Sequence, residues 1–346
     1  MESLPVKYRP KTFDAVCGQA TTIKILKRQL ETNEFSHAYL FSGPSGDGKT
    51  TIARIFANEL NHGQGTPIEI DGASNNGVDN VRRIIEDSKA RSLDSEYKVI
   101  IIDECHAITT QGWQAFLKCI EEPSPYTIFI FCTTDPQKIP ATIINRVIRF
   151  KLNRIKSDVI RDRLQYICEQ EGYTNYLDAC DYISKICNGG MRDAISYLEK
   201  CASYSNDLNI NNVIQSIGNF SYDIFIDLTN GLIDGNQQEV LSIIEKCFDS
   251  GADLKVFIDQ YLDFCLDLSK YCLFKDISLT KIPASLENPK NENDTRCIKY
   301  VTGIENNVKY FNALQDKILN IKNVLRYDST PKTTISVCLV NICRGM

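Results

Sequence analysis

The chain is predicted to have an α/β fold, a parallel sheet covered by helices, up to about Lys151, and to be purely helical beyond it. In the first part, short apolar runs alternate with amphipathic segments, which is the pattern of repeated βα units. One apolar run, Val99–Ile102, is apolar on both faces, as a central parallel strand should be. Beyond Lys151 the strand signals stop, and apolar residues recur at helical spacing.

Five strands are expected in the first part. They are His37–Ser42, Ile68–Asp71, Val99–Asp103, Thr127–Cys132 and Ile148–Leu152. Helices are expected between them, at about Thr21–Thr32, Lys49–Asn61, Val78–Ser92 and Trp113–Glu121. Strands that alternate with helices in this way favour parallel pairing, because each helix carries the chain back to the same edge of the sheet.

The second part divides into two helical segments. Ser157 opens a small helical unit that runs to about Ile217, and its hydroxyl is a plausible N-cap. Helical periodicity resumes at Phe220, and the stretch Lys281–Thr295, rich in Pro and Asn, is expected to be a loop between helices. We therefore expect three domains, at 1–156, 157–217 and 218–346.

Composition limits the class of protein. Of 346 residues, 43% are hydrophobic and 24% charged, which is typical of a soluble globular chain, and no apolar run reaches the roughly 20 residues of a membrane span. The N-terminus lacks the blocks of a secretory signal. The fourteen cysteines contain no Cys-x-x-Cys pair, so neither disulfides nor a zinc site is expected. A net charge of −5 leaves DNA contact to a local stripe of residues.

A phosphate-binding loop follows the first expected strand. The pattern G-x-x-x-x-G-K-[ST] is matched by Gly43-Pro44-Ser45-Gly46-Asp47-Gly48-Lys49-Thr50, with Thr51 next in the helix. Glycines let the backbone amides and the helix N-terminus face a phosphate group. Lys49 would contact the β- and γ-phosphates, and the Thr50 hydroxyl would bind Mg²⁺. The pattern therefore predicts an ATP site.

A pair of carboxylates ends the third expected strand. Asp103 and Glu104 follow the apolar run, where Asp103 would lie near Mg²⁺ and Glu104 near the attacking water. On its own such a pair would more often face solvent, but the phosphate-binding loop favours the catalytic interpretation. His106 has no second ligand placed to join it, so we assign it a structural or coupling role rather than metal binding.

Further segments narrow the class of ATPase. They are Lys7–Phe13, Gly18-Gln19, Glu121-Glu122-Pro123, Thr133–Pro140, Ile144–Val147 and Gly189–Ala194. With these, the chain closely resembles the AAA+ ATPase subunits of bacterial clamp loaders, the gamma/tau subunits of DNA polymerase III, and less closely the small subunits of replication factor C. The resemblance is strong from Lys7 to about Ala194 and weakens to general helical character after Phe220.

The resemblance implies a fold and site residues. It implies a five-stranded parallel sheet in the order 5-1-4-3-2, a helical lid and a C-terminal helical collar. Thr134 matches the sensor that reports the γ-phosphate, Arg146 the arginine finger that reaches a neighbouring subunit's ATP, and Arg192 the second sensor. The segments that line the adenine pocket in relatives contain Tyr8, Arg9, Pro10 and Val16.

The resemblance also implies partners and cofactors. The partners are a sliding clamp, primer-template DNA and other loader subunits in a pentameric assembly, and the cofactors are ATP and Mg²⁺.

The chain departs from the family's pattern in two places. The family's four-cysteine zinc module is absent, because only the seven residues 61–67 separate the helix after the phosphate-binding loop from the second expected strand. We therefore expect no zinc. The family's Ser-Arg-Cys is replaced by Asn145-Arg146-Val147. A compact chain without tau's long tail is compatible with a viral origin. Because the sequence has neither a membrane span nor a secretory signal, the expected location is the cytoplasm, in the bacterial cytosol or in a virus-infected host cell.

DNA contact is expected at the start of the helix after the second strand. The candidates are Asn75, Asn76, Arg82 and Arg83. They would contact the phosphate backbone without reading bases, although a solvated amphipathic face explains them equally well.

The expected function is that of an ATPase that opens a ring-shaped clamp and places it on DNA, but does not itself polymerise DNA. Two alternatives stay open: another AAA+ DNA remodeller such as a branch-migration helicase, or an ATP-binding scaffold subunit that does not hydrolyse.

Overall fold

The computed structural model describes residues 2–288, 294–305, 308–326 and 328–344, which form two compact units. The first unit comprises Met1–Gln170 with Cys187–Glu199, and the second comprises Glu171–Ile186 with Lys200–Met346. The expected helical lid, 157–217, contributes residues to both units. The division into three domains stays a prediction.

The first unit is built on a five-stranded sheet, in which all pairs are parallel. The strands are β1 (Ala38–Ser42), β2 (Ile68–Asp71), β3 (Lys98–Asp103), β4 (Thr127–Thr133) and β5 (Ile148–Lys151). Their spatial order is β2-β3-β4-β1-β5, so the expected order 5-1-4-3-2 is confirmed. The β4 strand runs one residue further than expected, and every other expected strand is found within one residue at each end.

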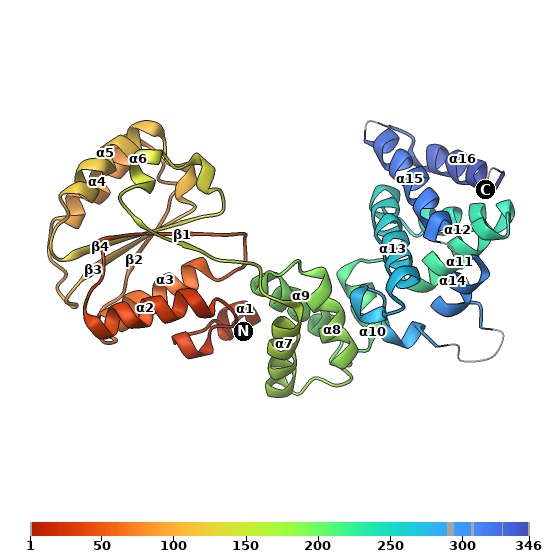
Figure 1. Ribbon diagram of the computed structural model, residues 1–346, viewed down its shortest axis with the longest axis horizontal. Helices are drawn as coiled ribbons and strands as arrows, with labels where there is room; N and C mark the ends of the chain where they lie inside the picture. The colour runs from red at the N-terminus through yellow and green to blue at the C-terminus, as the bar shows by residue number, and fades with distance from the viewer. Residues whose placement is uncertain (1, 289–293, 306–307, 327, 345–346) are drawn as a thin grey trace. The chain divides into compact units, whose positions relative to one another are not determined.

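Helices cover both faces of this sheet, because the central strands are apolar on both sides. Along β1, Tyr39 and Phe41 join the core on one face, whereas Ala38 and Leu40 join the core on the other. Figure 1 shows α2 (Ala20–Thr32) and α3 (Lys49–Leu60) on the first face. The opposite face is covered by α4 (Val78–Ser88), α5 (Thr110–Glu121) and α6 (Ala141–Ile144).

Short segments and two longer helices complete the first unit. The short segments are α1 (Leu4–Lys7), η1 (Phe13–Ala15), η2 (Cys105–Ala107) and η3 (Pro136–Lys138). The longer helices are α7 (Ser157–Glu171) and α9 (Met191–Tyr204), whose last residues belong to the second unit. The α4 helix ends earlier than expected, since it stops at Ser88 rather than Ser92.

The second unit is helical, as expected. Its elements are α8 (Leu177–Ile186), α10 (Ile210–Ile217), α11 (Tyr222–Ile233), α12 (Gln237–Asp249), α13 (Leu254–Phe274), η4 (Ile277–Leu279), η5 (Ala284–Leu286), α14 (Ile298–Glu305), α15 (Val308–Leu325) and α16 (Pro331–Arg344). Aromatic rings of α11 and α13 pack together in its core, among them Phe225, Phe257 and Phe264.

The predicted loop Lys281–Thr295 contains the 3₁₀ turn η5, and its residues 289–293 lie outside the described residues. In the described part of the chain, no helix combines the length and the apolar character that crossing a membrane requires.

Candidate nucleotide-binding site

The phosphate-binding loop connects β1 to α3 at the carboxyl edge of the sheet. It is held by backbone contacts: the Gly43 N–H donates to the Thr133 carbonyl at 3.2 Å. A Cβ at Gly43 would lie 2.7 Å from the Leu152 carbonyl oxygen, so a side chain does not fit there. Gly48 has φ +92°, a conformation that favours glycine, and α3 begins at the next residue. The loop is therefore fixed on both sides and opens onto a helix N-terminus.

The two predicted Mg²⁺ ligands lie together. The Thr50 hydroxyl donates to Asp103 Oδ2 at 2.8 Å, although the two residues are far apart in the sequence. An alcohol and a carboxylate oxygen at this spacing are the hard oxygen ligands that Mg²⁺ takes in nucleotide sites. Lys49 is buried, and its Nζ donates to the carbonyls of Gly43 and Pro44 at 2.8 and 2.6 Å. The residues present therefore fit a metal–triphosphate group.

Two side chains contact the Glu104 carboxylate, one from the residue that follows β4 and one from η2. Thr134, directly after β4, donates from its hydroxyl to Glu104 Oε2 at 3.1 Å. His106 Nδ1 lies 3.2 Å from the same oxygen and 3.2 Å from the Thr133 hydroxyl. Glu104 itself has φ +46°, a sparsely populated conformation for a residue with a side chain. The carboxylate is therefore held in one direction by a network that joins two strand ends.

A cavity of about 290 Å³ adjoins this loop. Among the predicted residues, it is lined by Tyr8, Arg9, Pro10, Val16, Ser45, Gly46, Asp47, Gly48, Lys49, Thr50, Thr51, Asp103, Glu104 and Arg192. Thr134 is linked to it through Glu104. Gly43 bounds the loop, and Arg146 is not among the described residues that line the cavity. Segments from the N-terminus, the sheet edge and α9 thus converge on one volume.

Several residues of this cavity were not expected from the sequence. They are Pro5, Cys17, Arg54, Glu69, Ile155, Arg163, Met191 and Ile195. Arg54 lies one turn after Thr50 on α3, so helical periodicity would have indicated it. Its Nη2 pairs with Glu69 Oε2 at 2.5 Å. Arg163 Nη2 donates to the Tyr8 carbonyl at 3.1 Å, a contact that sequence spacing does not indicate.

The cavity is electrostatically positive on one side. Burial lowers the pKa of the Arg9 guanidinium, and the neighbouring charges of Arg54 and Arg192 lower it further. Clustered guanidinium groups of this kind repel one another unless an anion lies between them. This wall therefore suits an anionic ligand, and Glu69 compensates part of its charge.

Arg146 and the DNA candidates lie elsewhere in the first unit. Arg146 Nη2 pairs with Glu121 Oε1 at 2.6 Å, and its Nη1 donates to the Thr142 carbonyl at 2.7 Å. Asn75 and Asn76 lie between β2 and α4. Arg82 and Arg83 are exposed on α4, and Arg82 makes a long ion pair of 3.4 Å with Asp79.

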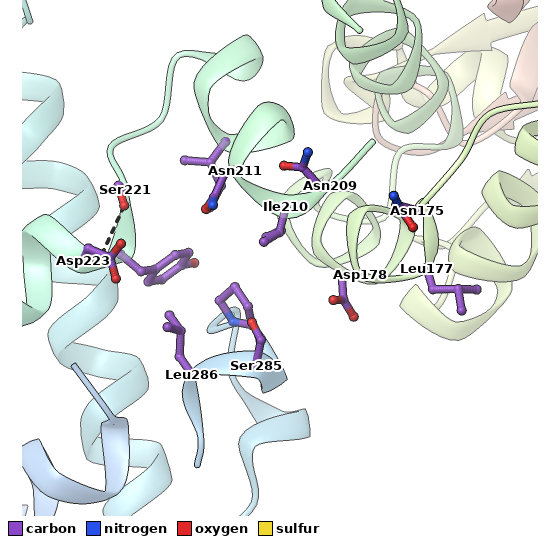
Figure 2. A pocket seen from close by; sticks show the side chains of 13 residues that line it. Asn175, Leu177, Asp178, Asn209, Ile210, Asn211, Ser221, Asp223, Ser285 and Leu286 are labelled. Atoms are coloured by element: carbon purple, nitrogen blue, oxygen red, sulfur yellow. Dashed lines mark hydrogen bonds between the residues drawn. The ribbon is translucent and has the colours of Figure 1, made fainter. Parts of the chain in front are cut away.

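A second cavity, of about 550 Å³, belongs to the second unit. Figure 2 shows side chains from α8, α10, α11 and η5 around it, including Asp178, Asn209 and Leu286. The Ser221 hydroxyl, at the start of α11, accepts from the Asp223 N–H at its rim. None of the predicted site residues lines this cavity.

The cysteines of the described residues form neither a disulfide nor a cluster of metal ligands. Ten of the fourteen cysteines lie in the interior, and no disulfide joins any of them. In the described ranges, no group of three or more His, Cys, Asp or Glu side chains is placed to hold a metal ion. The expectation that the chain binds no zinc stays a prediction.

Comparison with known proteins agrees with the site. The profile of the family described as DNA polymerase III, delta subunit, matches residues 18–77 and 62–156. The tau subunit of DNA polymerase III from Bacillus subtilis is 36% identical over 286 residues, 76% of this chain and 51% of that protein. The gamma subunit from Buchnera aphidicola is 31% identical over 335 residues, 90% of each chain.

A solved structure supports the fold. The Holliday junction branch migration motor RuvB of Thermotoga maritima aligns with a TM-score of 0.52 and 22% identity, covering 66% of this chain and 80% of that one. At this identity the likeness concerns the fold alone. The chain spans about half the length of the tau relatives it matches. By its similarity to the gamma and tau subunits over most of its length, the chain belongs to the DNA polymerase III gamma/tau family of AAA+ proteins.

Proposed function

We propose that the protein is the ATP-hydrolysing motor subunit of a sliding-clamp loader, which opens a ring-shaped clamp and places it on primer-template DNA. The observation that carries this proposal is the hydrogen-bonded network at the strand ends. It joins the Thr50–Asp103 pair to a Glu104 carboxylate that Thr134 orients. A scaffold that only binds ATP would not need an oriented carboxylate beside the phosphate site.

The residues of this chain would act as follows. Lys49 binds the β- and γ-phosphates once its bonds to the loop carbonyls are exchanged for phosphate oxygens. Thr50 and Asp103 hold Mg²⁺, which neutralises charge that develops on the phosphate oxygens. Glu104 orients the attacking water and accepts its proton, and Thr134 keeps that carboxylate directed at the γ-phosphate position.

Two arginines would connect hydrolysis to assembly. Arg192, at the start of α9, lines the cavity and would hold the lid against bound ATP. Arg146 would exchange Glu121 for the phosphates of a neighbouring subunit, because an arginine finger supplied from outside completes the site. Hydrolysis then depends on an oligomer, which we propose to be a pentamer that includes other loader subunits.

DNA would be bound through its phosphate backbone. Arg82 and Arg83 are exposed on α4, and the segment before that helix carries Asn75 and Asn76. Arginine and amide groups at this position would neutralise phosphates without reading base sequence. Substitution of Arg82 and Arg83 by Ala should therefore weaken binding equally for DNA of any sequence and reduce its salt dependence.

The test is binding to a purified sliding clamp from the same source. With a non-hydrolysable ATP analogue, the full chain and its loader partners should co-elute with the clamp, and without nucleotide they should not. The Lys49→Ala variant is the control, since it should not respond to the analogue. Clamp binding that is indifferent to nucleotide would contradict the proposal.

Stimulation of hydrolysis separates the alternatives. Clamp together with primed DNA should raise the ATPase rate more than a four-way DNA junction does. The opposite order would favour a branch-migration motor, and the absence of any turnover in the assembled complex would favour a scaffold. Elemental analysis of the purified protein should find no stoichiometric zinc; one tightly held zinc per chain would contradict that expectation.

A further inference from the structure

Asp47 lies inside the phosphate-binding loop and is unusually enclosed. Only 1% of its surface is exposed, yet it lines the nucleotide cavity. Neither carboxylate oxygen has a hydrogen-bond partner in the described part of the chain. A buried carboxylate without hydrogen bonds is destabilising when ionised, and folded proteins rarely leave one in that condition. The proposed mechanism makes no use of this side chain.

The loop around Asp47 is pressed against the start of α9. Gly46 has φ +80°, and a Cβ there would lie 3.2 Å from the Gly190 Cα. A Cβ at Gly190 would in turn lie 2.9 Å from Asp193 Oδ2 and 3.4 Å from the Ser45 carbonyl. Two glycines thus bring the loop and the helix into near contact beside Asp47.

Charged groups from three elements act on Asp47. Lys49, at the start of α3, and Arg154, after β5, favour its ionised form, whereas Asp193 on α9 opposes it. Arg192 lines the same cavity. Burial outweighs the two cations and raises the pKa of Asp47 to about 6. Lys49 acts on Asp47 through its charge and not through a hydrogen bond, because its ammonium group donates to the Gly43 and Pro44 carbonyls.

We propose that Asp47 takes up a proton when a nucleoside triphosphate binds, so that the nucleotide affinity of this site decreases as pH rises. This rests on the proposed function, since it assumes that the loop binds a triphosphate. The phosphate groups add several negative charges beside a carboxylate that solvent cannot reach, and like charges disfavour ionisation. The protonated carboxyl has an O–H that donates to a phosphate or carbonyl oxygen, which supplies the hydrogen bond that Asp47 lacks.

The direction of the effect follows from linkage. Below the pKa of Asp47 in the free protein, the carboxyl is already protonated and binding involves no proton uptake at this residue. Above that pKa, and below the higher pKa in the complex, binding requires one proton, so the dissociation constant rises up to about tenfold per pH unit. The range begins near pH 6, which is within reach of ordinary binding measurements.

The test compares nucleotide affinity across pH for the full chain and two variants. The probe is a fluorescent non-hydrolysable ATP analogue with Mg²⁺, between about pH 6 and about pH 8. For the unmodified chain the dissociation constant should rise roughly tenfold or more over that range. Asp47→Asn removes the proton and should leave only the small dependence that comes from the nucleotide itself. Asp193→Asn, the matched control, removes a charge that raises the pKa of Asp47, so the dependence should keep its slope and begin at lower pH.

A second measurement needs no variant. Calorimetric binding of the same analogue in two buffers of different ionisation enthalpy counts the protons taken up, and near pH 7 the unmodified chain should take up a large fraction of one proton. No uptake, or the same pH dependence in Asp47→Asn as in the unmodified chain, would overturn the inference while the proposed function stands. Failure of the unmodified chain to bind the analogue at any pH would overturn the nucleotide site and the inference together.

Discussion

Two sets of candidate site residues in the first unit differ in whether they contact one another within a single chain. At the strand ends, Thr50, Asp103, Glu104 and Thr134 form a continuous network of hydrogen bonds within one chain. Arg146 takes no part in it and is paired instead with Glu121 at the end of α5. The groups that we propose to bind metal and to orient water are therefore brought together by the folding of a single chain. The cation that would stabilise the transition state is left at the surface, where another subunit can use it.

The largest effect is expected at Arg146. Arg146→Ala should bind the ATP analogue as the unmodified chain does, but hydrolysis in the assembled complex should fall by about 10³-fold or more, as for other arginine fingers. Steady-state phosphate release in the presence of clamp and primed DNA measures this. If Arg146→Ala retains its stimulated activity, Arg146 does not complete the ATP site.

A mixing experiment tests whether Arg146 acts on a neighbour. Lys49→Ala has an intact Arg146, and Arg146→Ala has an intact phosphate-binding loop. Where they meet in a mixed assembly, one chain supplies the finger and the other the site, so part of the activity should return. A mixture that assembles but stays inactive would show that Arg146 does not act in trans.

The next largest effect is expected at Glu104. Glu104→Gln keeps the size of the side chain and can still accept from Thr134, but it no longer accepts the proton of water. Turnover should fall by about 10²- to 10⁴-fold while binding of the analogue is unchanged. Parallel titrations and rate measurements on one preparation check this. Equal losses of binding and turnover would mean that Glu104 is structural.

An intermediate effect, on the free energy of unfolding, is expected for Asp47→Asn. Burial raises the pKa of Asp47 to about 6. Between the ordinary pKa of an aspartate and about pH 6, the folded chain therefore keeps a proton that the unfolded chain has lost. The free energy of unfolding therefore decreases as pH rises from the pKa of Asp47 in the unfolded chain toward about 6. Asp47→Asn has no carboxyl at this position, so its free energy of unfolding should not decrease for this reason. The variant should be more stable by up to about 3 kcal/mol above pH 7, with no advantage below about pH 4. Denaturant unfolding at both pH values measures it.

The smallest effect is expected at Glu121. Its pair with Arg146 is largely solvent-exposed, with 39% and 47% of the two side chains accessible. Exposed pairs contribute little, so Glu121→Gln should change the unfolding free energy by less than about 1 kcal/mol. If Arg146 leaves Glu121 to reach a neighbour, hydrolysis should be unimpaired or slightly faster. A loss as large as that of Arg146→Ala would mean that Glu121 positions the finger.

The strands and the phosphate-binding loop could be predicted from the sequence because their signals are local. An apolar run such as Val99–Ile102 indicates a buried strand by itself, and the glycines and Lys49 occupy one short segment. The order of the strands followed from resemblance to a family, not from the pattern of residues. The contacts of Arg54 with Glu69 and of Arg163 with Tyr8 were missed, because each joins segments that the sequence does not relate.

The order of residues along the chain was enough to indicate which side chains have the chemistry of an ATP site and on which elements they lie. Helical and strand periodicity, together with the spacing of glycine, lysine and carboxylates, depends on neighbours along the chain. Which of these side chains contact one another depends on the tertiary structure. Thr50 reaches Asp103, and Thr134 reaches Glu104, because parallel strands bring their carboxyl ends to one edge. Burial of Asp47 was decided in the same way, by the approach of α9 to the loop.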